Sequence, residues 1–167
     1  MRSGGNIRWA ITVVLAALLE ATWMRGLSVQ GVVPDLVLVL VVYFAIAEGE
    51  ERAMFTGLLG GVFQDAAANT PLGQHVLCLV IVGFVLGRLS QRLVTDNPYI
   101  KAAAVFFASL VQGILFITID YVQKVDIESV YTMSFSLLPR AFYTAVTTPI
   151  IFFIMAWIRP RPIRNTL

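Results

Sequence analysis

The feature that most constrains this chain is a series of apolar runs, most of them about as long as a lipid bilayer is thick. A membrane-spanning helix needs about 20 mostly apolar residues, since each residue rises about 1.5 Å across a hydrocarbon layer of about 30 Å. Such runs cover approximately residues 9–27, 32–47, 53–67, 72–89, 99–122 and 135–158. We therefore predict a single all-α transmembrane domain, residues 1–167, built as a six-helix bundle.

The composition supports the same class of protein. Hydrophobic residues make up 58% of the 167 residues, charged residues make up 13%, and the mean hydropathy is +0.81. Soluble domains are about 45–50% apolar and about 25% charged, so too few polar side chains remain to cover a soluble monomer. Disordered chains lack the apolar surface that this chain has in excess. The net charge of +2 offers no basic field for nucleic acid.

The second and third runs have distinctive features. Pro34, near the start of the second run, is expected to open a helix, because a proline in the first turn loses no needed N–H. The third run, 53–67, is rich in glycine and somewhat short for the hydrocarbon layer. A helix of that length must lean on its neighbours, thin the bilayer locally or end inside a cavity.

The basic residues predict the orientation of the bundle, because cytoplasmic connections carry an excess of Lys and Arg. If both termini lie on one side, the opposite side has only Arg25 and Lys124, with Arg140 just inside the sixth run. The side with the termini then has nine basic residues: Arg2, Arg8, Arg52, Arg88, Arg92, Lys101, Arg159, Arg161 and Arg164. We therefore expect both termini in the cytoplasm.

Two pairs of glycines share a four-residue spacing. Gly57 and Gly61 lie in the third run, and Gly83 and Gly87 lie in the fourth. Small residues at this spacing let helix backbones approach closely in a membrane. The pairs are candidate strips for packing within this protein, or for contact with a partner helix or a ligand.

Several polar side chains are expected in the outer half of the bundle. They are Glu20, Gln64, Asp65, Gln112, Asp120 and Arg140, with His75 at the start of the fourth run. Unpaired ionisable groups are costly at bilayer depth, so Arg140 should pair with one of the carboxylates among them. The group is either an internal ion pair that sets helix register or the lining of an outward-facing cavity for a polar or anionic headgroup. Asp65 could instead face water at a helix end, and His75 is most simply an interfacial residue.

Motifs for catalysis or cofactor binding are absent from the sequence. There is no G-x-S-x-G elbow, and the glycine-rich stretch of the third run lacks the ending of a P-loop. His75 is the only histidine, which excludes an H-E-x-x-H helix, and Cys78 is the only cysteine, which excludes an internal disulfide. We expect no enzyme activity, no cofactor and no metal.

Short motifs along the chain point to a known family. Residues 34–38 read Pro-Asp-Leu-Val-Leu and open an apolar run, and residues 57–65 read Gly-Leu-Leu-Gly-Gly-Val-Phe-Gln-Asp. Residues 71–73 read Pro-Leu-Gly, and an apolar run containing Gly83 and Gly87 follows. In these motifs, and in its length, span count and loop sizes, the chain resembles the rod shape-determining protein MreD family.

The resemblance implies a non-enzymatic subunit of the bacterial inner membrane, within the cell-elongation machinery known as the Rod complex or elongasome. Members associate with the bitopic protein MreC, and through it with the polymerase RodA, the class B penicillin-binding protein PBP2 and the actin-like MreB. Their fold resembles the substrate-binding subunit of energy-coupling-factor transporters, a six-helix bundle with an outer cavity. We therefore expect a scaffold that organises peptidoglycan synthesis and maintains rod shape, with membrane lipid as a further partner.

Two other interpretations remain open. The chain could be the substrate-binding subunit of an energy-coupling-factor vitamin transporter, which would carry an alanine-rich docking motif on its first helix. Ala16, Ala17 and Ala21 match that motif only faintly. An intramembrane enzyme ranks third, because no reactive pair of side chains is evident. The acidic turn at residues 48–52 is either a simple helix connection or a contact for a cytoplasmic partner.

Overall fold

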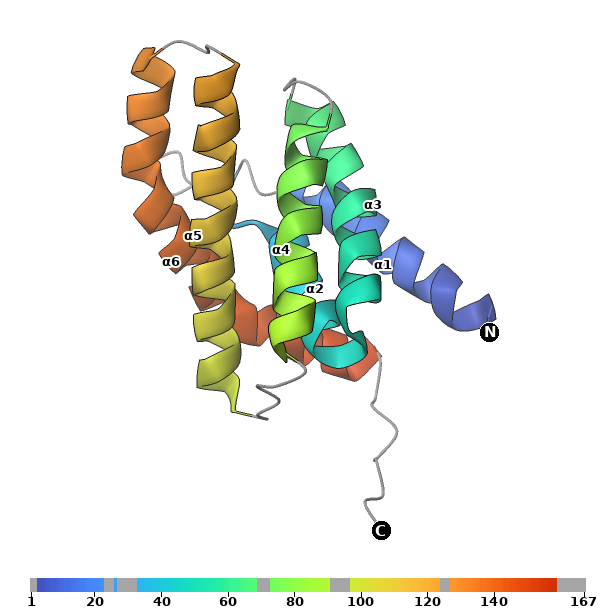
Figure 1. Ribbon diagram of the computed structural model, residues 1–167. Helices are drawn as coiled ribbons and strands as arrows, with labels where there is room; N and C mark the ends of the chain where they lie inside the picture. Colours follow the sequence, from blue (N-terminus) through green and yellow to red (C-terminus); the bar gives the residue numbers. More distant parts are fainter. Residues whose placement is uncertain are drawn as a thin grey trace.

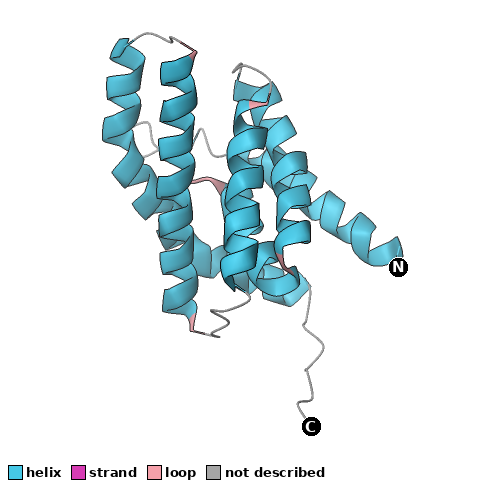
Figure 2. Cartoon of the chain, in the orientation of Figure 1, coloured by secondary structure: helices cyan, strands magenta, loops and turns pink. Residues whose placement is uncertain are grey.

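A computed structural model describes residues 3–22, 26, 33–68, 73–90, 97–123 and 127–158, with only the backbone given for residues 3–5 and 127–133. In these residues the chain forms six α-helices and no strand (Figures 1 and 2). The helices are α1 (Ser3–Thr22), α2 (Leu36–Glu48), α3 (Glu50–Ala68), α4 (Gln74–Ser90), α5 (Pro98–Val122) and α6 (Ile127–Ile158). The all-helical class and the six helices are as the sequence predicts.

The helix ends differ from the predicted runs by a few residues, and two starts differ most. The first helix begins at Ser3 rather than Trp9, and the sixth begins at Ile127 rather than Phe135. Hydropathy marks where a helix can enter hydrocarbon, whereas backbone hydrogen bonding continues through more polar residues. The expected end of the first run and start of the second lie outside the described residues. Seven of the basic residues used for the orientation also lie outside the described residues: Arg2, Arg25, Arg92, Lys124, Arg159, Arg161 and Arg164. Pro71 and Leu72 of the Pro-Leu-Gly motif lie outside them as well.

Helix α2 is the centre of the bundle. It packs against all five other helices, and its residues from Leu36 to Ala45 are all buried. A helix that is apolar all round must be enclosed on every side, because it has no polar face to offer water. Its 13 residues reach only about 20 Å, less than the hydrocarbon layer of about 30 Å. Figure 1 shows it behind α3 and α4.

The start of α2 corrects one prediction. Pro34 precedes the helix, and Asp35 is its N-cap, with its side chain accepting a hydrogen bond from the Leu38 N–H at 2.8 Å. An N-cap carboxylate satisfies one of the N–H groups that the first turn leaves without a helical partner. The boundary is therefore defined by the carboxylate of Asp35, not by the fixed φ of proline.

Helices α3 and α4 pack through their glycines. A Cβ atom placed on Gly61 would lie 2.6 Å from the Cα of Val76, and one on Gly57 would lie 2.7 Å from the carbonyl oxygen of Leu79. Toward the other end, Gly83 and Gly87 lie equally close to the α3 backbone. Because real Cβ atoms do not approach backbone so closely, only glycine fits at these positions.

Helices α5 and α6 form a second antiparallel pair (Figure 1). Helix α6 has 32 residues, or about 48 Å if it were straight, and it contains Pro139 and Pro149. An internal proline removes a helical hydrogen bond and bends the axis. Accordingly, α6 runs beside α5 over its first part and then turns beneath the other helices.

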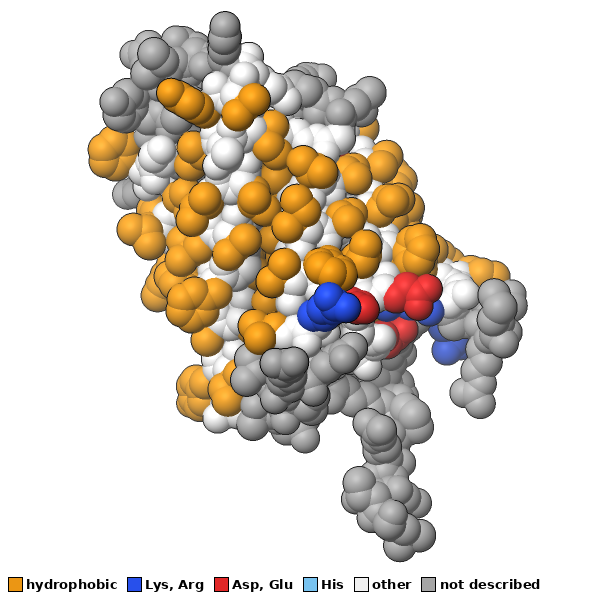
Figure 3. All heavy atoms as spheres, in the orientation of Figure 1, with side chains coloured by type: hydrophobic (Ala, Val, Ile, Leu, Met, Phe, Trp, Pro, Cys, Tyr) orange, Lys and Arg blue, Asp and Glu red, His pale blue; other side chains and the backbone are white. Residues whose placement is uncertain are grey.

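The outer surface is largely apolar. Figure 3 shows hydrophobic side chains over most of the visible face, with charged side chains gathered toward one end. Residues Pro98–Val122 and Ser134–Ile158 are long and apolar enough to cross a membrane, and only 22% of an 18-residue apolar stretch in each is buried. Large exposed side chains such as Phe153 (75%) and Trp157 (83%) suit a lipid environment rather than water. The described chain is thus consistent with a helical membrane protein.

Candidate functional site

A buried carboxylate, Asp35, joins four elements at the start of α2. Its Oδ1 accepts hydrogen bonds from the Leu38 N–H at 2.8 Å and from Gln64 Nε2 on α3 at 3.0 Å. Its Oδ2 accepts from Gln112 Nε2 on α5 at 2.9 Å and from Arg140 Nη2 on α6 at 3.2 Å. Only 1% of Asp35 is exposed. One side chain therefore fixes the register of α2, α3, α5 and α6.

A second carboxylate, Glu20 of α1, lies beside the first. Its Oε1 accepts from Gln64 Nε2 at 2.8 Å and its Oε2 accepts from the Val37 N–H at 3.2 Å. The backbone N–H of Asp35 donates to Thr144 Oγ1 of α6 at 3.2 Å. Partial positive charge gathers at a helix N-terminus, so both acidic side chains stand where α2 favours them.

The partner of Arg140 was not among those predicted. Sequence reasoning offered Glu20, Asp65 or Asp120, whereas Arg140 forms its salt bridge with Asp35. In the sequence Asp35 only opens an apolar run, whereas in the structure α2 begins midway along α5 and α6, as the contacts to Gln112 and Arg140 show. A signal was present: the apolar run that follows Asp35 is too short to span the bilayer from one side to the other.

Asp65 has a separate structural task. Its Oδ1 accepts from the His75 N–H at 2.9 Å and contacts His75 Nδ1 at 2.8 Å, and its Oδ2 accepts from the Gly73 N–H at 2.8 Å. It thereby ties the end of α3 to the start of α4. Only 2% of Asp65 is exposed, so the interpretation that it faces water is wrong.

Neither His75 nor Asp120 is the ion-pair partner of Arg140. The ring of His75 is buried, packs against Phe116 with 4.8 Å between ring centroids, and lines the same cavity as Arg140. Asp120 is buried at the end of α5 and accepts a hydrogen bond from Gln74 Nε2. Of the six predicted polar residues, the structure brings together Glu20, Gln64, Gln112 and Arg140, while Asp65 and Asp120 bind elsewhere.

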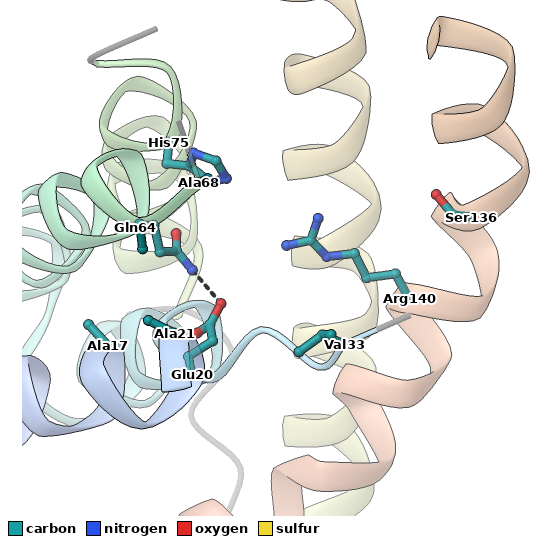
Figure 4. Close-up of a pocket in the computed structure, with 10 residues that line it drawn as sticks. Ala17, Glu20, Ala21, Val33, Gln64, Ala68, His75, Ser136 and Arg140 are labelled. Atoms are coloured by element: carbon teal, nitrogen blue, oxygen red, sulfur yellow. Dashed lines mark hydrogen bonds between the residues drawn. The ribbon is translucent and has the colours of Figure 1, made fainter. Parts of the chain in front are cut away.

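A cavity of about 320 Å³ opens beside this network. It lies between α1, α3 and α4 on one side and α6 on the other. The backbone of α6 approaches α2 and α5 but none of those three helices within the described residues. Alanines 17, 21, 67 and 68 contribute no bulk, which leaves the space open. Its other lining residues are Glu20, Val33, Gln64, His75, Ser136 and Arg140 (Figure 4).

Two polar groups of the cavity lining have unused hydrogen-bonding capacity. Gln64 Oε1 is buried and accepts no hydrogen bond within the described part of the chain. The guanidinium of Arg140 uses one N–H on Asp35, and its side chain is 43% exposed. In Figure 4 it reaches from α6 toward the side where Gln64 and His75 lie. Such an arrangement can hold a polar ligand. No group of three side chains that could together bind a metal ion occurs among the described residues.

The glycine strips are part of the core and not a free surface. Gly57 and Gly61 face α4, and Gly83 and Gly87 face α3, each against neighbouring backbone. This arrangement is the one expected of glycines that pack helices within the protein. The faces that carry them are covered by α3 and α4 themselves.

Comparison with known proteins identifies one family. Residues 2–159 match the family model described as rod shape-determining protein MreD. No curated protein and no solved structure matches the chain.

Proposed function

Because the chain belongs to the rod shape-determining protein MreD family, we propose that it is a non-enzymatic scaffold subunit of the bacterial cell-elongation complex. The match over residues 2–159, nearly the whole chain, is the observation that carries this proposal. In this role the chain binds MreC and so helps to organise the peptidoglycan synthases RodA and PBP2 and the cytoskeletal protein MreB.

The same proposal places the chain in the inner membrane as a multi-pass protein with both termini in the cytoplasm. The basic residues support this orientation. Arg52 and Arg88 lie at the same end of the α3–α4 pair and form ion pairs with Glu48 and Glu50 there. The proposal also includes the fold of the substrate-binding subunit of energy-coupling-factor transporters. The short central helix α2 and the cavity on the side away from these charges support it.

The partner surface is proposed to be an apolar face of α5 or α6. The glycine strips are not proposed for this role, because α3 and α4 bury them against each other. Helix α5 exposes Phe107 and Ile114, and α6 exposes Phe142 and Phe153. A single membrane helix such as that of MreC could pack against these side chains by van der Waals contact, the main attraction between helices in lipid.

The cavity between α1 and α6 is proposed to face outward and to hold a polar lipid headgroup. Its polar lining is at the end of α3 and the start of α4, opposite the charged end of that pair. A volume of about 320 Å³ is at the lower end of the range for ligand pockets, about 300–1,000 Å³.

The test is a gentle-detergent pull-down of the tagged full chain from its native membrane, with mass spectrometry of bound proteins and small molecules. Recovery of MreC with RodA and a penicillin-binding protein supports the scaffold. Recovery of ATPase subunits with a stoichiometric vitamin, and no wall-synthesis protein, contradicts it and supports a transporter subunit.

Two variants make the pull-down sharper. Gly61→Val forces α4 away from α3, so the variant chain should not fold and should therefore lose every specific partner. Glu48→Gln removes one half of an exposed ion pair and should keep them all. Partners recovered equally with both variants are detergent contaminants.

A further inference from the structure

The cavity beside Asp35 presents both an unsatisfied acceptor and an under-used donor. Gln64 is 8% exposed, both protons of its amide are engaged by Glu20 and Asp35, and its Oε1 has no partner in the described residues. A buried oxygen without a partner is costly, so a ligand that donates to it gains correspondingly. On the opposite wall, Arg140 donates to Asp35 through Nη2 alone among the described residues.

The acceptors and donors lie on different walls. Glu20 and Gln64 come from α1 and α3, and Arg140 comes from α6 (Figure 4). A ligand that satisfies both walls must place an anionic acceptor against α6 and an N–H or O–H donor against α1 and α3. Guanidinium groups bind phosphate oxygens well because several N–H donors lie in one plane.

The two buried carboxylates, Asp35 and Glu20, indicate which kind of hydrogen-bond donor the ligand carries. Asp35 has Arg140 as its counter-ion, whereas Glu20 forms no salt bridge within the described residues. Buried acidic groups are normally paired with a cation. An ammonium supplies both a positive charge for Glu20 and a hydrogen-bond donor for Gln64 Oε1, whereas a hydroxyl supplies only the donor.

We propose that this cavity binds a group containing both a phosphate ester and a primary ammonium, in the form of the phosphoethanolamine headgroup of a membrane phospholipid. The phosphate contacts Arg140, and the ammonium contacts Gln64 Oε1 and Glu20. This inference rests on the proposed outward-facing headgroup cavity and names its ligand. Alanines 21, 67 and 68 leave room for the carbons of the headgroup.

The experiment measures lipid retention by native mass spectrometry. The purified full chain is equilibrated in mixed micelles with equal amounts of phosphatidylethanolamine, phosphatidylcholine and phosphatidylglycerol of identical acyl chains. Phosphatidylethanolamine should be retained roughly tenfold more than either competitor, since each competitor loses a charge-assisted hydrogen bond at Gln64 and Glu20. Equal retention of the three lipids would overturn the proposal.

Two variants locate the binding. Ala21→Phe fills the cavity without changing a polar group, and it should reduce the preference to less than about twofold. Ala68→Phe, at an exposed position on the same cavity, serves if Ala21→Phe is not recovered folded. The matched control is Ala103→Phe on the exposed face of α5, which should keep the full preference. An unchanged preference in both cavity variants would exclude this cavity as the site.

A second arm separates the two sources of the headgroup chemistry. Soluble phosphoethanolamine is added to the lipid-loaded chain. Persistence of the bound lipid supports a phospholipid ligand, whereas replacement of the lipid by the soluble compound supports the same chemistry from a soluble source and overturns the lipid assignment.

The lipid measurement is repeated on the tagged chain recovered from its native membrane, where bound MreC is measured as well. Chain that retains MreC without any lipid preference refutes the headgroup inference and leaves the scaffold intact. Chain that keeps the lipid preference but does not bind MreC supports the headgroup inference and contradicts the scaffold proposal.

Discussion

The α3–α4 contact and the junction around Asp35 are two solutions to the same problem, holding helices together where water is scarce. Between α3 and α4 the backbones touch through Gly57, Gly61, Gly83 and Gly87, and the close fit along the middle of the pair depends on shape. Around Asp35, helices from distant parts of the chain are joined by hydrogen bonds to one carboxylate, and a cavity remains beside them.

The difference shows how one bundle combines rigidity with an open space. Close backbone packing leaves no gap and needs only that side chains be absent. A polar junction can bridge a gap, but each buried member left without a partner is costly, as Gln64 Oε1 is within the described residues. This difference accounts for the position of the cavity, which lies beside the Asp35 junction and not between α3 and α4. The following variants test the difference between the two regions.

The largest effect is expected from Asp35→Asn. It removes the charge of a buried carboxylate that accepts four hydrogen bonds, so the free energy of unfolding should fall by about 3–5 kcal/mol, even though the Arg140 side chain is 43% exposed. Cys78, the only cysteine, is buried, so its reaction with a thiol dye during heating of the detergent-solubilised chain reports unfolding. A melting temperature equal to that of the parent chain would show that the junction does not support the fold.

The double variant Asp35→Asn with Arg140→Gln sharpens this result. Removing both charges leaves no unpaired ion, so the double variant should lose less free energy of unfolding than Asp35→Asn alone. The same thiol assay measures it. Additive losses would mean that the two residues act independently despite their 3.2 Å contact.

Gly61→Ala should have the next largest effect. The new methyl group would lie against the Val76 Cα, which belongs to a helix backbone and cannot rotate away. Overpacking of this kind costs about 1–3 kcal/mol. Thermal unfolding in detergent is again the measurement.

Gly113→Ala on α5 is the matched control for Gly61→Ala. Its new Cβ would meet only side-chain atoms of Leu137, which can change rotamer, so stability should change by less than about 1 kcal/mol. Equal losses in the two variants would show that backbone contact is not what distinguishes the α3–α4 pair.

The smallest effect is expected from Glu48→Gln, which belongs to neither region. Its ion pair with Arg52 is partly exposed, with 32% and 26% of the two side chains accessible. Such pairs contribute about 0–1 kcal/mol, and less at high salt. A loss as large as that of Gly61→Ala, in melting curves taken at low and high salt, would contradict this ranking.

The helices and the glycine contacts could be predicted from the sequence because each depends on local information. Hydropathy over a window locates a helix, and the Gly57–Gly61 spacing defines a strip whatever it faces. The junction could not, since the partner of Arg140 depends on where α2 begins in space. In the sequence Asp35 only opens an apolar run, and the three-dimensional arrangement is what brings it to Gln112 and Arg140.

The distance along the chain between Asp35 and its counter-ion has a consequence for biosynthesis. Arg140 follows Asp35 by 105 residues, and at about 5–20 residues per second a ribosome needs on the order of 5–20 s to reach it. Throughout that interval the nascent chain contains the central helix α2 but not the arginine that pairs with its N-cap residue, Asp35. Assembly of the bundle therefore cannot finish helix by helix as the chain emerges. It waits for the last helix, and a product truncated before Arg140 would present quality-control proteases with an acidic group that nothing neutralises.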